Sequence, residues 1–343
     1  MLGGGVYVTQ NKTLPGAYIN VVNAGATSSA IGERGVVAIA LPIGKAEGTV
    51  IEITRADFVK NSSSILGKAY DSEDVIALRE IFCHANKVYL YDLGTSGTVS
   101  EAINALEACE FNILCAYSSE SSDITAYITA VKTWRDEMGK KCQVVVYNQT
   151  APDYEGVINV VSKAKDAEDH ALIAWVAGAE AGCKVNESCT NKLYDGEYSI
   201  IADKTQAQLE TCLKDGQIVF HLVYGEIRML EDINSLTTIT LEKGEDFKYN
   251  QTIRVVDQIA NDIARLFNTK YLGKIPNNAS GRVSLWGDIV AHHRALASIQ
   301  AIEAFDSTKL TVEQGATKKS VVVNDVITVV NAMAQLYMTV VVQ

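Results

Sequence analysis

Residues 111–147, FNILCAYSSESSDITAYITAVKTWRDEMGKKCQVVVY, contain the pattern that decides the fold. FNILCAY (111–117) and CQVVVY (142–147) are short, nearly continuous apolar runs, which is typical of strands buried on both faces. Between them a helical pattern starts at Asp123 and stops at Gly139. Its apolar stripe comprises Ile124, Ile128, Val131, Trp134 and Met138. A strand, a helix and a second strand in this order predict a βαβ unit with parallel strands.

The same alternation continues on both sides of this unit. KVYLYDL (87–93) is a further strand, which follows a helix capped at Asp71 or Ser72 and carrying Val75, Leu78 and Phe82. Downstream, the sequence predicts a buried helix in DHALIAWVAGAEAG, a helix closed by Gly216, and a hairpin around Tyr224-Gly225. The middle of the chain is therefore expected to form an α/β layer with a mainly parallel sheet.

The C-terminal part differs in kind, because long helices replace the short alternation. One helix is expected over roughly 249–268, with a stripe of Ile253, Val256, Ile259, Ile263 and Leu266. A second is expected over roughly 282–304, with a stripe of Leu285, Ile289, Leu296 and Ile299. Two β segments, SVVVNDVITVV (320–330) and LYMTVVV (336–342), follow.

The last seven residues, YMTVVVQ, are strand-forming and carry no charged side chain. Alternation places Met338, Val340 and Val342 on one face and mostly apolar residues on the other, so both faces can be buried. Such a segment is expected to pair with a sheet, either in its own subunit or in a neighbour.

Composition restricts the classes of function. The apolar share of 48% and the charged share of 21% suit a globular protein, and no secretory signal or membrane-spanning run is visible. A net charge of −11 argues against a nucleic-acid binder. Residues 1–242 carry 32 acidic and 19 basic side chains, whereas residues 243–343 carry 9 and 11. The acidic part is either a solvated face or a surface that meets different neighbours. Seven scattered cysteines predict buried, reduced thiols.

The motifs of common enzymes are absent from the sequence. It contains no phosphate-binding glycine loop, no GxSxG and no HExxH, and its cysteine spacings do not suit zinc. AGAEAG (177–182) lies in an apolar helix and indicates close helix packing. His292, one turn after Asp288 on an apolar stripe, is expected to be a hydrogen-bonded core or interface residue. A catalytic Asp288–His292 pair would need a nucleophile that the sequence does not supply. We therefore expect no catalytic, cofactor-binding or metal-binding residues.

Several ordered stretches resemble the contractile tail sheath proteins of bacteriophages and of R-type bacteriocins. They run over nearly the whole chain: QNKTLPGAYINVV (10–22), RGVVAIALPIG (34–44), YNQTAPDYEGVINVV (147–161), AWVAGAEAGCKVNESCTNKLYDGEY (174–198), EDINSLTT (231–238), NQTIRVVDQIANDIARLFNTKYLGKIPNNASGR (250–282) and LYMTVVV (336–342). Any one of these stretches alone would be weak evidence for the family, but their order along the chain makes the resemblance strong.

The resemblance implies an α/β protein, α+β overall, with an inner domain of long helices and a sheet built from both chain termini. An α/β outer domain would be inserted between them. The implied divisions are 1–20 (N-terminal arm and part of the inner domain), 21–240 (outer domain) and 241–343 (inner domain with a donated terminal strand). The acidic part would then face outward, away from the tail tube.

The resemblance also implies that terminal arms join the sheets of neighbouring subunits. The implied arm residues are Ala17, Tyr18, Ile19, Val21, Val22, Tyr337, Met338, Thr339, Val340, Val341 and Val342. The implied function is structural and not enzymatic: the subunit would polymerise helically around a tail tube and contract from a metastable state. Its partners would be further copies of itself, the tube protein, and baseplate and tail terminator proteins. No nucleic acid, cofactor or membrane insertion is implied.

Two other readings stay open from the sequence: a binding module that does not assemble, and an open α/β enzyme such as a hydrolase. The resemblance places the protein in the bacterial host cytoplasm during assembly, and then in a released phage tail or tail-like particle.

Overall fold

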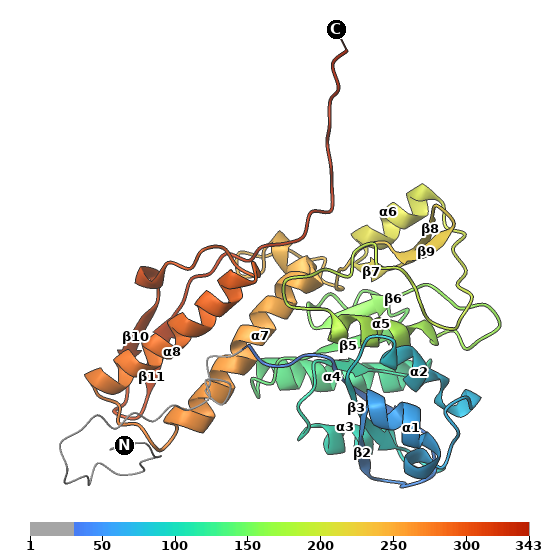
Figure 1. The fold of residues 1–343 in the computed structure, drawn as a ribbon, viewed down its shortest axis with the longest axis horizontal. Coiled ribbons are helices and arrows are strands. Elements are labelled where there is room, and N and C mark those ends of the chain that lie inside the picture. Colours follow the sequence, from blue (N-terminus) through green and yellow to red (C-terminus); the bar gives the residue numbers. More distant parts are fainter. Residues whose placement is uncertain (1–30, 343) are drawn as a thin grey trace, which may run out of the picture. The chain divides into compact units, whose positions relative to one another are not determined.

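A computed structural model describes residues 31–342 of the 343-residue chain. Contacts divide these residues into two compact units. The larger unit comprises Gly32–Asn261, Leu296–Phe305 and the chain from Ile327 onward. The smaller comprises Asp262–Ala295 and Asp306–Val326, together with Ile31. The contact boundary in the middle of the chain thus lies after Asn261, inside a long helix (Figure 1). The division into an arm, an outer domain and an inner domain stays a prediction.

The larger unit is built on a seven-stranded sheet with the order β2-β3-β1-β4-β5-β6-β7. All neighbouring strands are parallel except β2, which pairs antiparallel with β3. The predicted, mainly parallel sheet is therefore confirmed. Its strands are β1 (Val36–Leu41), β2 (Val50–Thr54), β3 (Lys87–Asp92), β4 (Ile113–Cys115), β5 (Gln143–Tyr147), β6 (Val157–Val160) and β7 (Gln217–Ile218).

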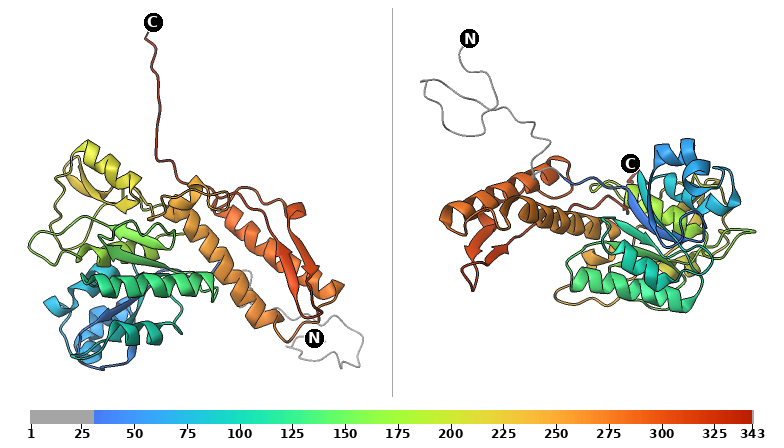
Figure 2. Two further views of the ribbon diagram at one scale, coloured as in Figure 1. Left: turned by 180° about the vertical axis from the view of Figure 1, so that it is seen from behind. Right: turned by 90° about the horizontal axis from the view of Figure 1, so that it is seen from below.

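Helices cover both faces of this sheet, because alternate strand residues point to opposite sides. Val37, Ile39 and Leu41 of β1 join the core that contains α1 (Arg55–Leu66), α2 (Ile76–Phe82) and α5 (Leu172–Gly182). Ala38 and Ala40 join the core that contains α3 (Val99–Leu106) and α4 (Ser121–Asp136). Figure 2 shows the sheet between these helical layers. The helix α6 (Gln206–Lys214) leads into β7.

One predicted helix differs from the structure at its end, and another confirms a packing prediction. α4 ends at Asp136, and Met138 beyond it is 52% exposed, so the predicted stripe was wrong at its last position. Gly139 has a φ of +75°, which suits the chain reversal there. In α5, a Cβ on Gly178 would lie 2.3 Å from the carbonyl oxygen of Ile81, which confirms close helix packing as the reason for AGAEAG.

The predicted hairpin around Tyr224-Gly225 is present as β8 (Phe220–Val223) and β9 (Glu226–Met229). Both turn residues have positive φ, 50° and 87°, which is the backbone of a two-residue type I′ turn.

The cysteines are free thiols, and five of the seven are buried. Burial raises the pKa of the Cys142 thiol to about 12, so that residue is expected to be inert.

α7 (Asn250–Leu266) continues into a π-helical turn, Phe267–Tyr271. The next long helix, α8 (Ala279–Ser298), ends six residues earlier than the predicted residue 304. Gln300 adopts φ +61°, while the amides of Gln300 and Ala301 donate to the carbonyls of Ala297 and Leu296. This is a Schellman ending, and it uses glutamine where glycine is usual.

The smaller unit contains most of α8 and one hairpin, β10 (Thr311–Gln314) with β11 (Val321–Asn324). The indole nitrogen of Trp286 on α8 donates to Leu310 O at 3.0 Å, just before β10. Asn277 Nδ2 donates to Ser320 O at 2.8 Å, just before β11. These bonds attach the start of each strand to the helical part of the unit. Within residues 31–342, no helix has the length and apolarity needed to cross a bilayer.

Candidate assembly site

The C-terminal segment is exposed along both of its predicted faces. Met338, Val340 and Val342 are 74%, 70% and 90% exposed, and Tyr337 and Val341 on the other face are equally open. Residues 333–342 form no helix or strand with any part of the chain that the structure describes (Figure 1). Contiguous exposed apolar surface of this kind marks an interaction site. The predicted N-terminal arm residues Ala17, Tyr18, Ile19, Val21 and Val22 lie outside the described residues.

The segment leaves the larger unit from a well-anchored root, residues 328–332. The amide of Val330 donates to Ala301 O at 3.1 Å, and the amide of Glu303 donates to Thr328 O at 2.8 Å. The amide of Ala332 donates to Gln251 Oε1 at 2.9 Å, and Gln251 Nε2 donates to Val330 O at 3.2 Å. After Ala332, backbone anchoring ends among the described residues.

Many of the buried residues of α7 are polar or charged, which the sequence pattern did not predict. Arg254, Asp257 and Gln258 are buried, whereas Val256, Ile259 and Ile263 of the predicted apolar stripe are only half-buried or partly exposed. Ile253 and Leu266 are buried as expected. Each buried polar side chain has a partner: Arg135, for example, donates two hydrogen bonds to Asp257, at 2.5 and 2.9 Å.

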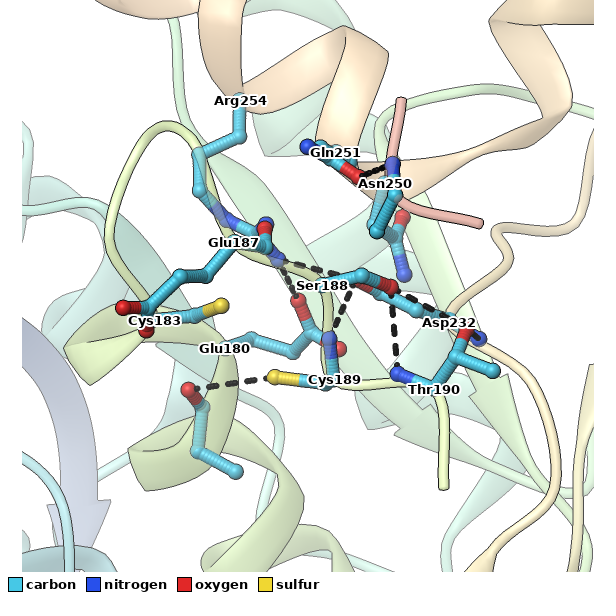
Figure 3. Close-up of polar contacts among 12 residues, drawn as sticks. Glu180, Cys183, Glu187, Ser188, Cys189, Thr190, Asp232, Asn250, Gln251 and Arg254 are labelled. Atoms are coloured by element: carbon cyan, nitrogen blue, oxygen red, sulfur yellow. Dashed lines mark hydrogen bonds and ion pairs between the residues drawn. The ribbon is translucent and has the colours of Figure 1, made fainter. Parts of the chain in front are cut away.

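Arg254 is the centre of a fully buried ionic cluster (Figure 3). Its guanidinium donates to Glu180 Oε2 at 2.6 Å, to Asp232 Oδ2 at 3.2 Å and to Glu187 O at 2.7 Å. All three charged side chains are about 1% exposed. The cluster therefore joins α7 to α5, to the loop that carries Glu187, and to the chain that follows β9.

Burial and the charge of Asp232 raise the pKa of Glu180 well above its usual value. Burial also opposes the ionised form of Asp232, but the charge of Arg254 and a bond from the Cys189 amide outweigh it, so the pKa of Asp232 is lowered. Glu180, Cys189 and Asp232 have ligand atoms within 4.8 Å of one another, a spacing that could suit a metal ion. Arg254 already supplies a cation to both carboxylates, so the cluster fits a metal poorly.

Two adjacent histidines on α8 are fully buried in the smaller unit. His292 Nε2 lies 3.0 Å from Asp262 Oδ2, and His293 Nε2 lies 2.5 Å from Asp325 Oδ2. The prediction of a hydrogen-bonded core histidine is confirmed. Asp288 instead accepts bonds from Lys270 and Tyr271, both at 2.5 Å, so the Asp288–His292 pair considered from the sequence does not form.

The carboxyl edge of the parallel sheet is where open α/β proteins usually bind ligands. Here the loop after β1 surrounds the protein's own Asp92, whose oxygens accept from the amides of Ile43, Gly44, Lys45, Ala46 and Gly94 at 2.7–3.1 Å. A cavity of about 730 Å³ at the same edge is lined by Glu73, Asp166, Glu168 and Asp169, with Tyr117 and Tyr198. Neither feature suits a phosphate group, because the amide donors are already used and the cavity is acidic.

Comparisons with known proteins agree with this architecture. Two family models match: one described as the phage tail sheath protein central domain, over residues 94–235, and one as the phage tail sheath C-terminal domain, over residues 242–343. A tail sheath protein of Clostridium phage phiCD119 is 30% identical over 269 residues, which cover 76% of this chain and 74% of the relative. The phage-like element PBSX protein XkdK of Bacillus subtilis is 28% identical over 70% of this chain and 55% of the relative.

Solved structures give the same result. The sheath tail protein of Desulfitobacterium hafniense aligns with a TM-score of 0.77 and 25% identity, over 92% of this chain and all of that one. The contracted helical sheath of the anti-feeding prophage aligns with a TM-score of 0.70 and 17% identity, over 96% and 99% of the two chains. These matches define a structural subunit of contractile tails. The chain belongs to the family of phage tail sheath proteins.

Proposed function

We propose that this sheath subunit polymerises helically around a tail tube and contracts from a metastable extended lattice, driving the tube into a target cell envelope. The observation that carries the proposal is the exposed, strand-forming segment 337–342 on a hydrogen-bonded root. Head-to-tail contacts that do not close on themselves build helical arrays, and a segment donated to the next copy is such a contact.

The chemistry of the segment supports donation as an added strand. Pairing would satisfy its backbone groups, while Met338, Val340 and Val342 would fill pockets on one face. Burying its five apolar side chains is worth roughly 8–15 kcal/mol before ordering. Fixing six residues of backbone costs roughly 6–12 kcal/mol. One arm would therefore bind weakly, and lattice stability would come from many arms together. Ala17, Tyr18, Ile19, Val21 and Val22 would form the N-terminal arm.

The β10–β11 hairpin has the features of an acceptor for such strands. A two-stranded sheet is marginally stable by itself, and neither outer edge is paired with another strand in residues 31–342. Val322 and Val323 on β11 are partly exposed. Donated strands on its edges would bury these side chains and extend the sheet across subunits.

Contraction in this proposal uses no bound nucleotide. Free energy would be stored in the extended lattice and released as the compact domains rotate and repack, while paired arms keep the subunits connected. The loop around Asp92, whose amides already bind that side chain, and the acidic cavity support a non-enzymatic role.

The tube, baseplate and tail terminator proteins are the proposed partners. The acidic outer domain, residues 21–240, would face outward. Assembly would occur in the bacterial host cytoplasm, before release of the particle.

Negative-stain electron microscopy with an antibody label tests the proposal, using induced host lysates that contain tail particles. The full chain is compared with a chain that ends at Leu336. Labelled rods from the full chain and none from the folded truncation are expected. Labelled rods from both would show that the arm is dispensable. Diffuse label without rods would instead favour a binding module that does not assemble.

A further inference from the structure

Two buried glutamines on α7 form hydrogen bonds with backbone groups. Gln251 and Gln258 are 3% and 5% exposed, and they lie seven residues apart, which places them on the same face about 10 Å apart. Gln251 binds Val330 O and the amide of Ala332. Gln258 Nε2 donates to Gly32 O at 3.2 Å. All these residues belong to the larger unit.

One bound stretch is where the larger unit begins, and the other directly precedes the exposed C-terminal segment. Gly32 is its first residue. Val330 and Ala332 directly precede the exposed segment 333–342. One helix face therefore contacts both Gly32 and the root of the C-terminal segment, through a side-chain amide near the start of α7 and another near its middle.

Arg254 lies between the two glutamines on this face, three residues after Gln251 and four before Gln258. Its bonds to Glu180, Asp232 and Glu187 O attach α7 firmly to the rest of the unit. The glutamines consequently project from a helix whose position is already determined by buried charges.

Hydrogen bonds, rather than apolar packing, attach the C-terminal root at Gln251. A cavity of about 280 Å³ lies beside it, lined by polar and small residues that include Gln251, Asn331 and Ala332. A buried primary amide is unfavourable unless its donor and acceptor are paired, and here the backbone at 330 and 332 pairs with both. The side-chain amide of Gln251 thus pairs with the backbone of the root in the way that a neighbouring strand would.

We propose that Gln251 and Gln258 are arm-positioning residues: a two-amide clamp on α7 that determines where both terminal arms leave the subunit. This inference rests on the proposed function, because the arms matter only if they are donated. With the clamp intact, both arms start from points at a fixed separation, so each is delivered to its acceptor in register. Without the Gln251 bonds, the subunit stays folded but the anchoring of the root ends at Asn331, so the C-terminal arm starts from a less defined position.

Hydrogen exchange of the Ala332 amide tests the clamp in the isolated full-length chain, by NMR or by mass spectrometry with residue resolution. Gln251→Met removes both hydrogen bonds and keeps the side-chain volume. Gln251→Glu removes the donor to Val330 O and keeps the acceptor for Ala332. We expect exchange at Ala332 to rise at least tenfold in Q251M and to stay within about threefold of wild type in Q251E. The surface variant Q206M is the matched control and should leave exchange unchanged. Unchanged exchange in Q251M would overturn the clamp.

The yield of assembled rods is the second readout. If a glutamine served only the stability of the fold, its substitution could lower rod yield only by also lowering the melting temperature. Q251M and Q258M are each expected to lower the yield of regular rods at least fivefold, and Q206M to leave it unchanged. Normal rods in both variants would overturn the positioning role. If wild type forms no rods, the proposed function fails, and the positioning role fails with it. The exchange measurement would still decide whether Gln251 holds the root.

Discussion

At the scale of the residue, Arg254 is the centre of the buried ionic cluster in the larger unit. Its guanidinium is the shared partner of Glu180 and Asp232, and none of the three reaches solvent. Removing one partner from a buried ionic cluster leaves uncompensated charge in a medium that solvates it poorly. Arg254 therefore stabilises the fold chiefly by compensating the charge of these buried carboxylates.

Arg254→Met is expected to lower the free energy of unfolding by about 3–5 kcal/mol, because Glu180 and Asp232 lose their common cation. Chemical denaturation at neutral pH measures the change. Arg228→Met is the control, because Arg228 pairs with the half-exposed Glu226 and should contribute less than about 1 kcal/mol. Equal effects of the two substitutions would contradict the account of the cluster.

The same cluster predicts how stability depends on pH. The pKa of Glu180 is raised in the folded state, so between its unfolded value near 4.5 and its folded value the native chain holds an extra proton. Stability from this group is complete below the unfolded pKa and is lost as pH rises, by up to about 1.4 kcal/mol per unit. Glu180→Gln should remove this slope, so the wild type should weaken relative to E180Q with rising pH. Denaturation curves from about pH 5 to pH 8 measure it. A constant difference would contradict the prediction.

The contact between α2 and α5 illustrates how an element is positioned by one small residue. A Cβ on Gly178 would lie 2.3 Å from Ile81 O, so α5 would have to move away from α2. Gly287 on α8 has nothing within 4 Å of the same position. Gly178→Ala should therefore destabilise by about 1–3 kcal/mol, whereas Gly287→Ala should stabilise by up to about 1 kcal/mol. Opposite signs in thermal unfolding are the expected result. A neutral or stabilising G178A would contradict the close packing.

The elements that could be predicted from the sequence are those whose apolar pattern faces a core. The strands β4 and β5 are nearly continuous apolar runs, and the Tyr224-Gly225 turn carries the chemistry that its hairpin needs. The polar face of α7 could not be predicted, because its partners lie far away in sequence: Glu180 is 74 residues from Arg254. The end of α8 was missed because Gln300 adopts a conformation that sequence rules assign to glycine.

At the scale of the whole molecule, the predicted C-terminal arm is the segment whose apolar side chains remain exposed in the single chain. The family assignment followed from ordered stretches over most of the sequence. The anchoring of the arm root did not, since Gln251 and Val330 give no local signal of contact. Strand pairing between subunits depends on the sheet edge of a second copy, which no local pattern in one sequence specifies.

Val340→Asp should leave the subunit folded, since Val340 is 70% exposed, but should strongly reduce rod formation by placing a charge in a paired apolar face. Val59→Asp, at an exposed valine on α1, is the matched control and should assemble normally. Rod yield by electron microscopy and folding by circular dichroism measure the two effects. Normal assembly of V340D would remove the main support for strand donation.

The most direct test is a helical reconstruction of assembled rods by cryo-electron microscopy, at a resolution that traces the backbone. The account predicts that residues 337–342 form a strand hydrogen-bonded to the sheet of another subunit, leaving from a root still bound by Gln251. A reconstruction in which these residues pair within their own subunit, or with no sheet, would contradict it.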